Sequence, residues 1–240
     1  MSSHHLDLQA QSSEELLAKL AAIDIAVPPY DEKRPTPLRE RYMAARLLST
    51  LASTNLIKFP MRLEHGDKPD FGLHSPTEKI GIECVEATHE EWAQIQAIRD
   101  QDYPEALVFL PMLRPGKNSF TLEQKLEIAQ GKKAGPPWVG KMAEKQWAEA
   151  MVDVIAKKTK KLRNGNYSDF TSNWLLIQDE WPVPLYQLEK KMAAASLCLN
   201  AAGPYLDEHC FSNIFIGDST ALIHLKRDGV KAYEMVDLWK

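Results

Sequence analysis

Apolar residues recur along the chain with either helical or strand spacing, and this pattern predicts most of its secondary structure. Segment 12–23 starts with serine, has glutamate three residues later and continues as LLAKLAAI, a capping box followed by an amphipathic helix. Prolines interrupt the pattern. Thr36 and Pro37 then predict the N-cap and first turn of a second helix, which we expect to end near residue 53.

Three short segments with strand-like composition follow the second helix and are separated by turn sequences. They are residues 56–65, 70–74 and 78–87, with GDKP and SPT between them. Strands that follow one another so closely in sequence predict an antiparallel meander. A further helix is expected over residues 89–100.

The second half of the chain alternates between helical and strand patterns. Prolines and glycines are frequent over about residues 100–138, so we expect an insertion there, with a small helix at 122–130. Beyond it the pattern predicts a long helix, a buried strand, another helix and two strands, at residues 139–163, 173–179, 185–202, 211–217 and 220–225. This order predicts an α/β fold, with a helical extension over residues 1–35 and a single domain over residues 36–240.

The composition narrows the class of protein. A chain of 240 residues, 44% of them hydrophobic, can bury a sizeable core unaided, and three cysteines without a CxxC pair indicate neither a disulfide framework nor a zinc site. The N-terminus lacks a signal-peptide pattern and the longest apolar run contains a proline, so we expect a cytoplasmic protein without a membrane segment. A net charge of −4 argues against a globally basic nucleic-acid coat but allows a local basic face.

Two acidic residues flank the hairpin predicted from the second and third strands. A hairpin with its tip near residues 75–76 brings Asp70 and Glu83 side by side, and by strand alternation Glu83 lies on the face opposite Ile82 and Cys84. Carboxylates on neighbouring strands supply the hard oxygen ligands that Mg²⁺ requires. The alternative interpretation is that Asp70 caps a turn after Pro69 and that Glu83 is a solvated acid on an edge strand.

The segment KPDFGLHSPTEKIGIECVEA resembles the signature of the PD-(D/E)XK nuclease-like superfamily, in which Pro-Asp on one strand precedes (D/E)xK on the next. The resemblance covers roughly residues 37–87 and 139–179. It implies a restriction-endonuclease-like fold, a mixed central sheet flanked by helices, here with a Pro/Gly-rich insertion. It also implies hydrolysis of nucleic-acid phosphodiester bonds with Mg²⁺ or Mn²⁺ bound by Asp70 and Glu83. Val85 stands in the position of the motif lysine.

The resemblance also implies a glutamate from the helix before the sheet as a further metal ligand and catalytic residue, and Glu40 is the candidate. Ala44, Leu47 and Leu51 follow it at helical spacing, so Glu40 lies on the apolar stripe of its helix. A carboxylate in that position needs a partner or a metal. The alternative is an acid in the first turn that interacts with the helix dipole.

The long helix offers a replacement for the missing motif lysine. Trp147, Met151, Val154, Lys158 and Lys161 step by four, three, four and three residues, which places both lysines in line with an apolar stripe. Relocation of the catalytic lysine to a neighbouring helix is known in the superfamily, so the resemblance implies Lys158 first, and Lys161 second, as catalytic residues. The alternative is a solvated basic last turn that complements the helix dipole and still contacts a phosphate backbone.

Other residues are weaker candidates. His65, His74 and His89 lack the spacing of zinc ligands, and Cys84 fits a small core residue better than a nucleophile. The acids at positions 179 and 180 end a predicted strand, where they either reach the site or form a turn.

Two functions remain open at the level of sequence. The first is a Mg²⁺-dependent nuclease. The second is a catalytically inactive module of the same fold that binds nucleic acid or a protein partner. Val85 in the position of the motif lysine is the reason to consider it.

Overall fold

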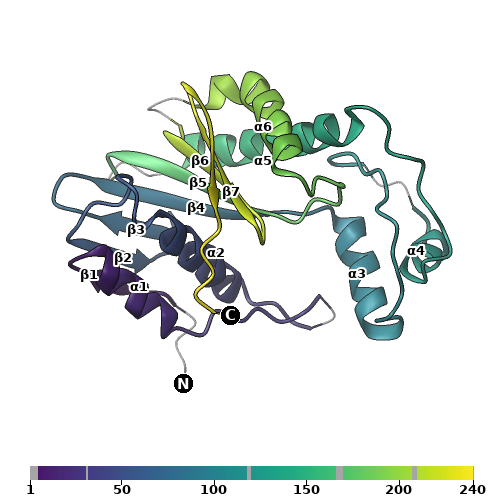
Figure 1. Ribbon diagram of the computed structural model, residues 1–240, viewed down its shortest axis with the longest axis horizontal. Coiled ribbons are helices and arrows are strands. Elements are labelled where there is room, and N and C mark those ends of the chain that lie inside the picture. The colour runs from purple at the N-terminus through teal and green to yellow at the C-terminus, as the bar shows by residue number, and fades with distance from the viewer. Residues whose placement is uncertain (1–4, 31, 118–119, 166–169, 207–209, 240) are drawn as a thin grey trace.

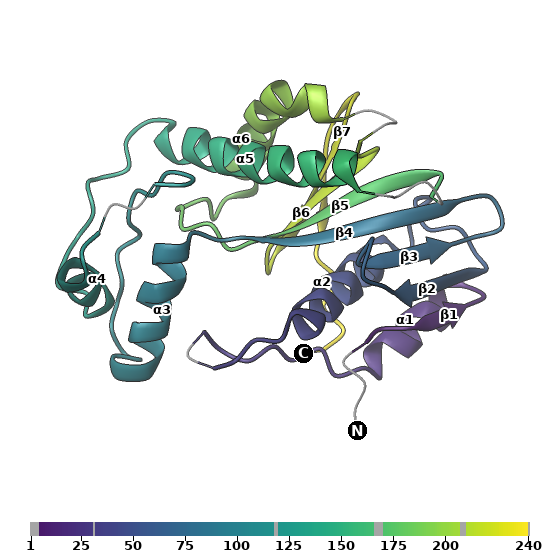
Figure 2. The same ribbon diagram turned by 180° about the vertical axis from the view of Figure 1, so that it is seen from behind.

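A mixed eight-stranded sheet with helices on both faces forms the centre of the molecule (Figures 1 and 2). The computed structural model describes residues 5–30, 32–117, 120–165, 170–206 and 210–239. The strands lie in chain order, β1 (Leu8–Ala10), β2 (Met61–His65), β3 (Phe71–His74), β4 (Lys79–Ala87), β5 (Ser172–Asp179), β6 (Asn213–Gly217), β7 (Ala221–Lys226) and β8 (Gly229–Glu234). The α/β class and the flanked mixed sheet expected from the sequence are confirmed.

The three central strands β4, β5 and β6 are parallel, and every other neighbouring pair is antiparallel. Parallel neighbours need long crossover connections, and helices supply them here. α3 (Glu90–Asp102), α4 (Leu122–Ala129) and α5 (Met142–Asn164) lie between β4 and β5, and α6 (Leu188–Ala202) with the short helix η1 (Gly203–Tyr205) lies between β5 and β6. The carboxyl ends of the parallel strands therefore meet at one edge of the sheet.

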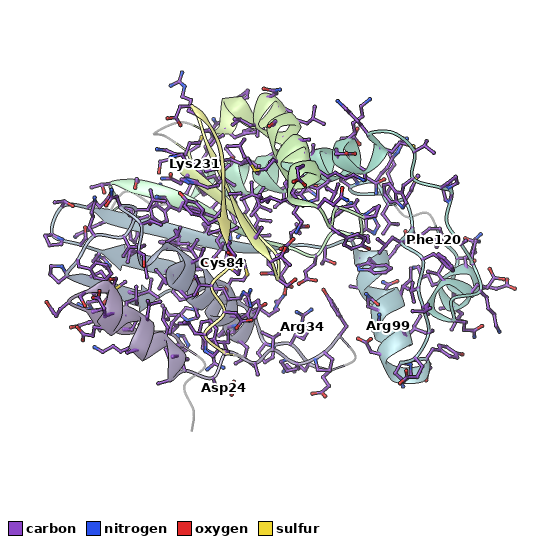
Figure 3. All side chains as sticks on the ribbon, in the orientation of Figure 1. Asp24, Arg34, Cys84, Arg99, Phe120 and Lys231 are labelled. Carbon is purple, nitrogen blue, oxygen red and sulfur yellow. The ribbon has the colours of Figure 1, made fainter. Side chains whose placement is uncertain are left out.

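Each face of the sheet has its own hydrophobic core. α1 (Ser13–Ala21) and α2 (Thr36–Leu51) pack against one face, where they meet Ile80, Ile82 and Cys84 of β4. α5 and α6 pack against the other face, with Leu175 and Ile177 of β5. Figure 3 shows the side chains that fill both interfaces. Because side chains alternate along a strand, Glu83 lies on the α5 face and its neighbour Cys84 on the α2 face.

The segment expected as an insertion lies at one end of the sheet, together with α3. In both views α3 and α4 lie beyond the end of the sheet at which β4 leads into α3 (Figures 1 and 2). The buried residues Ile95, Leu113 and Ile128 join α3, α4 and the segment between them to the α5-side core. The small helix expected at 122–130 is confirmed as α4, which begins after a capping box at Thr121.

Other expected elements are confirmed, with shifted boundaries. Helix α1 has Ser12 as its N-cap, as the sequence predicts. The expectation for Thr36 is wrong, because Pro35 is the N-cap of α2 and Thr36 is its first helical residue. β2 begins at Met61 rather than 56, since Pro60 has no N–H to contribute to a ladder.

Two strands were not expected. β1 is three residues long, too short to show a period, and it pairs with β2, so the segment expected as a helical extension also contributes a strand. β8 forms a hairpin with β7 through a two-residue turn. The sequence did not predict this strand, because GVKAYE is only weakly apolar. None of the helices in the described part of the chain is both long and apolar enough to cross a membrane.

Candidate active site

The β3–β4 hairpin presents Asp70 and Glu83 next to each other. The antiparallel register pairs Phe71 with Ile82, and its continuation by one residue places Asp70 opposite Glu83. The backbone N–H of Cys84 donates to Asp70 Oδ2 at 2.6 Å, which fixes the aspartate at the start of β3. Both acids are buried. The sequence expectation that the hairpin brings these two residues together is confirmed.

The environment of Asp70 disfavours its negative charge. Burial first, and the nearby carboxylate of Glu83 second, raise the pKa of Asp70 to about 6, against the opposing effects of the Cys84 N–H and of Lys158. Glu40 raises the pKa of Asp70 further. Two adjacent carboxylates in a buried place form a concentration of negative charge that a divalent cation would relieve.

Helix α5 places two lysines against Glu83. Lys158 Nζ donates to Glu83 Oε2 at 2.9 Å, and Lys161 Nζ lies 3.9 Å from the same oxygen. The Lys158 side chain is 15% exposed and that of Glu83 is 3% exposed, whereas Lys161 is 54% exposed. The apolar stripe of Trp147, Met151 and Ile155 packs α5 onto the sheet, so a lysine in line with that stripe points toward β4.

A hollow of about 440 Å³ opens beside these lysines, and we call it the lysine hollow. Its walls include Val85, Asp153, Lys157, Lys158, Lys161 and Trp181. Val85 belongs to the same face of β4 as Glu83. Lys158 of α5 and the side chain at position 85 of β4 therefore line the same hollow.

Glu40 does not join the Asp70–Glu83 pair. Its Oε2 lies 3.0 Å from Nε2 of His65 on β2. Because the N–H of Leu6 donates to Nδ1 of His65, the proton of the neutral ring is on Nε2, which donates to Glu40. Over the described ranges, no three His, Cys, Asp or Glu side chains are grouped closely enough to hold a metal ion. A divalent cation would thus have two carboxylate ligands here, Asp70 and Glu83. Glu40 adds negative charge from further away.

The weaker candidates lie outside this group. His74 Nε2 lies 3.0 Å from Glu64 Oε2 in a partly exposed place. Cys84 is buried and the pKa of its thiol is raised well above normal, chiefly by burial, which fits a core residue. Asp179 accepts hydrogen bonds from the Trp147 indole and the Trp181 N–H, and burial raises the pKa of Asp179 to about 7. These hydrogen bonds of Asp179 therefore link β5 to α5 and do not involve Glu83.

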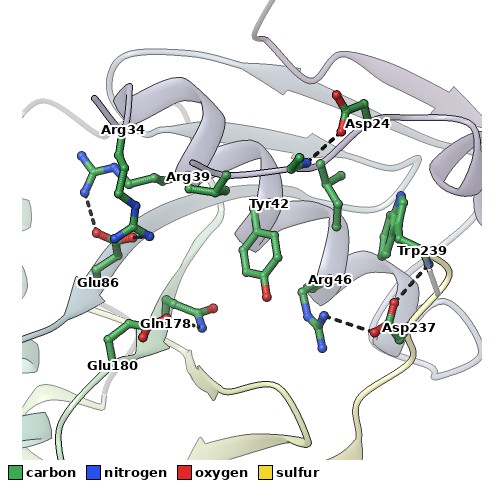
Figure 4. Close-up of a pocket in the computed structure, with 13 residues that line it drawn as sticks. Asp24, Arg34, Arg39, Tyr42, Arg46, Glu86, Gln178, Glu180, Asp237 and Trp239 are labelled. Carbon is green, nitrogen blue, oxygen red and sulfur yellow. Dashed lines mark hydrogen bonds and ion pairs between the residues drawn. The ribbon is translucent and has the colours of Figure 1, made fainter. Parts of the chain in front are cut away.

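Sequence reasoning missed a larger hollow on the opposite face, the arginine cavity. It encloses about 690 Å³ between α2, β4, β5 and the C-terminal segment (Figure 4). Arg39, Tyr42 and Arg46 share one face of α2 at spacings of three and four, and Figure 4 shows Tyr42 projecting into the middle of the cavity. Arg34 and Arg39 contact Glu86 at 3.2 and 2.5 Å. The helical spacing of Arg39, Tyr42 and Arg46 was the available signal.

Three hollows share a wall at the carboxyl end of β4. A third hollow, of about 310 Å³ and lined by Glu40 and Cys84 among others, lies between α2 and β4. Glu86 lines this hollow, the arginine cavity and the lysine hollow. β4 thus carries one acid for each face, Glu83 with the lysines of α5 and Glu86 with the arginines of the α2 side.

Comparisons of this chain with models of protein families, with curated proteins and with solved structures gave no match.

Proposed function

We propose that this protein is a metal-dependent nuclease of the PD-(D/E)XK, restriction-endonuclease-like class, in which the catalytic lysine comes from α5. One observation carries the proposal: Lys158 Nζ lies 2.9 Å from Glu83 Oε2 and lines the same hollow as Val85, the residue in the motif-lysine position. Asp70 stands opposite Glu83 on the neighbouring strand. Acid, acid and ammonium are thereby assembled from three elements.

The two carboxylates suit a hard divalent cation by chemistry and by proximity. Mg²⁺ or Mn²⁺ held by Asp70 and Glu83 would supply Lewis-acid stabilisation of a phosphate and acidify a bound water. Lys158 is the protein's own contribution to charge stabilisation, because a fixed ammonium in a poorly solvated site stabilises negative charge that develops on the phosphoryl oxygens. Lys161, more exposed and one turn further, is placed to contact a neighbouring phosphate.

The test is cleavage of labelled DNA and RNA oligonucleotides, with and without Mg²⁺ or Mn²⁺. We expect metal-dependent cleavage that Asp70→Asn, Glu83→Gln and Lys158→Ala each reduce at least about 100-fold. Lys160→Ala is the matched control, since Lys160 is an exposed lysine of the same helix outside the hollow. It should cleave like the wild type.

A relocation variant sharpens this test. If Lys158 replaces a lysine at position 85, then Val85→Lys combined with Lys158→Ala should recover part of the activity that Lys158→Ala loses. Recovery by Val85→Lys shows that the ammonium, and not the helix packing, is required. Absence of cleavage by the folded wild-type protein under all metal conditions would contradict the proposal.

A second function has an observation in its favour. Lys158 already pairs with Glu83, and among the residues placed by the structure no third His, Cys, Asp or Glu side chain joins the two acids in a metal-binding group. This arrangement also suits a catalytically inactive module that binds nucleic acid or a protein partner. Calorimetry separates the two functions, because the inactive module would bind neither Mg²⁺ nor Mn²⁺ at millimolar concentration.

A further inference from the structure

A tight turn of the insertion forms the second wall of the lysine hollow. The N–H of Lys117 donates to the carbonyl of Arg114 at 3.2 Å, and Gly116 has φ of 67°. Proline followed by glycine with positive φ is the signature of a type II turn. Pro115 and Gly116, at the tip of this turn, line the hollow that Lys158 also lines.

His89 holds the turn in place. Its Nδ1 accepts the N–H of Glu91 at 3.2 Å, so the proton of the neutral ring is on Nε2. Nε2 lies 3.0 Å from the carbonyl oxygen of Lys117 and 3.2 Å from that of Arg114, and so donates to both ends of the turn. His89 is buried and packs edge-on against Trp181. The turn is therefore attached to the first residues of α3.

A second attachment acts close by. The carboxylate of Glu91 accepts the N–H of Phe120 at 2.9 Å and lies 3.6 Å from Lys125 Nζ. Glu91 is almost fully buried. His89 and Glu91 therefore attach this part of the insertion to the start of α3 at two points.

The charges of the hollow differ between its walls. On α5, Lys157 pairs with Asp153 and Lys158 with Glu83, and the mainly exposed Lys161 leaves this wall with a net positive charge. Glu90 lies on the α3 side of the hollow. Glu86, which also lines the hollow, is neutralised by arginines from the α2 side. A polyanionic backbone is thus attracted to the α5 wall and repelled from the α3 wall, which directs the bases of a bound strand toward the turn.

Two residues that line the hollow carry buried polar groups without a hydrogen-bond partner in the described part of the chain. The indole N–H of Trp181 and the hydroxyl of Thr88 have no hydrogen-bond partner within the described part of the chain. Buried polar groups are normally hydrogen-bonded, and such exceptions in a ligand hollow point to groups that a ligand satisfies. Thr88 directly follows β4 and Trp181 follows β5, so both residues line the hollow from the sheet and not from α5.

We infer that the lysine hollow takes one unpaired strand, so that the substrate is single-stranded nucleic acid and the turn held by His89 excludes duplex. This inference rests on the proposed function. A hollow of about 440 Å³ is in the range of sites for a single small ligand, ~300–1,000 Å³. One nucleotide fits that space. A paired strand brings its complement with it, and a hollow of this volume, bounded on one side by the turn, is too small for both.

The experiment measures binding separately from cleavage. Fluorescence anisotropy in EDTA compares a labelled oligonucleotide of mixed sequence with the duplex it forms with its complement. We expect the wild type to bind the single strand at least about tenfold more tightly than the duplex. His89→Ala should reduce this ratio severalfold by strengthening duplex binding, and His74→Ala, a histidine outside the hollow, should leave it unchanged.

A second variant guards against misfolding of His89→Ala. Gly116→Ala places a Cβ in open space but at an unfavourable φ, so it disturbs the turn through the backbone alone and should also reduce the ratio. Equal binding of single strand and duplex by the wild type, or a ratio unchanged in both folded variants, overturns the inference. Strand preference without cleavage by any metal would refute the nuclease and leave the inference standing. Equal metal-dependent cleavage of both substrates would do the reverse.

Discussion

Removal of the Lys158 ammonium leaves the Glu83 carboxylate in a buried place with a weaker counter-charge. Lys158→Met keeps the length and apolar stem of the side chain and deletes only the charge. Removing one partner of a buried ion pair costs about 3–5 kcal/mol, because the remaining charge is left uncompensated. Lys161 Nζ, at 3.9 Å, remains as a partial partner. We therefore expect a loss in the free energy of unfolding of about 2–3 kcal/mol, below the full range.

Urea unfolding followed by circular dichroism measures this loss. In a chain of 240 residues each kcal/mol corresponds to roughly 2–4 °C, so the melting temperature should fall by about 4–12 °C. Lys160→Met is the control, because an exposed lysine on the same helix should change stability by no more than about 0.5 kcal/mol. Adding Glu83→Gln to Lys158→Met should restore part of the loss, since the uncompensated charge disappears.

The result that would refute this reasoning is equal stability of Lys158→Met and Lys160→Met. The buried pair would then contribute nothing, and Glu83 would have to be solvated or protonated in the folded protein. The placement of Lys158 beside the acids, on which the proposed function depends, would fall with it.

Three further predictions concern the acids of the sheet. Millimolar Mg²⁺ or Mn²⁺ should raise the melting temperature of the wild type and not that of Asp70→Asn, as differential scanning fluorimetry would show. Glu86→Gln should cost about 1–2 kcal/mol in urea unfolding, because Arg34 and Arg39 lose their anionic acceptor; an unchanged midpoint would contradict the pairing. Burial raises the pKa of Asp179 from 3.8 to about 7, so the folded state holds this proton more strongly than the unfolded state does. The stability that protonation provides is complete below pH 4 and lost as the pH rises to 7. Between these pH values the free energy of unfolding of Asp179→Asn should therefore increase relative to the wild type by at most about 4 kcal/mol. Parallel pH profiles of the unfolding free energies of the two proteins would disprove it.

Local pattern alone determined much of the fold and half of the candidate site. The spacing of Thr121 and Gln124 and the stripe on α5 specify helices through contacts a few residues apart, and strand alternation assigns Glu83 to one face. A short turn between β3 and β4 likewise fixes which residues face each other, so the Asp70–Glu83 pair follows from the hairpin.

Tertiary structure decided which of these faces meet. Lys158 reaches Glu83 across 75 positions of sequence, and no local rule separates that outcome from a solvated helix end. The resemblance and the helical stripe assigned Glu40 to the site, yet in the folded protein its side chain contacts His65 of β2. The pairing of Arg34 and Arg39 with Glu86 was likewise decided by tertiary packing. Periodicity records how each element divides into faces, whereas partners depend on crossover connections and on packing, which residues distant in sequence specify together.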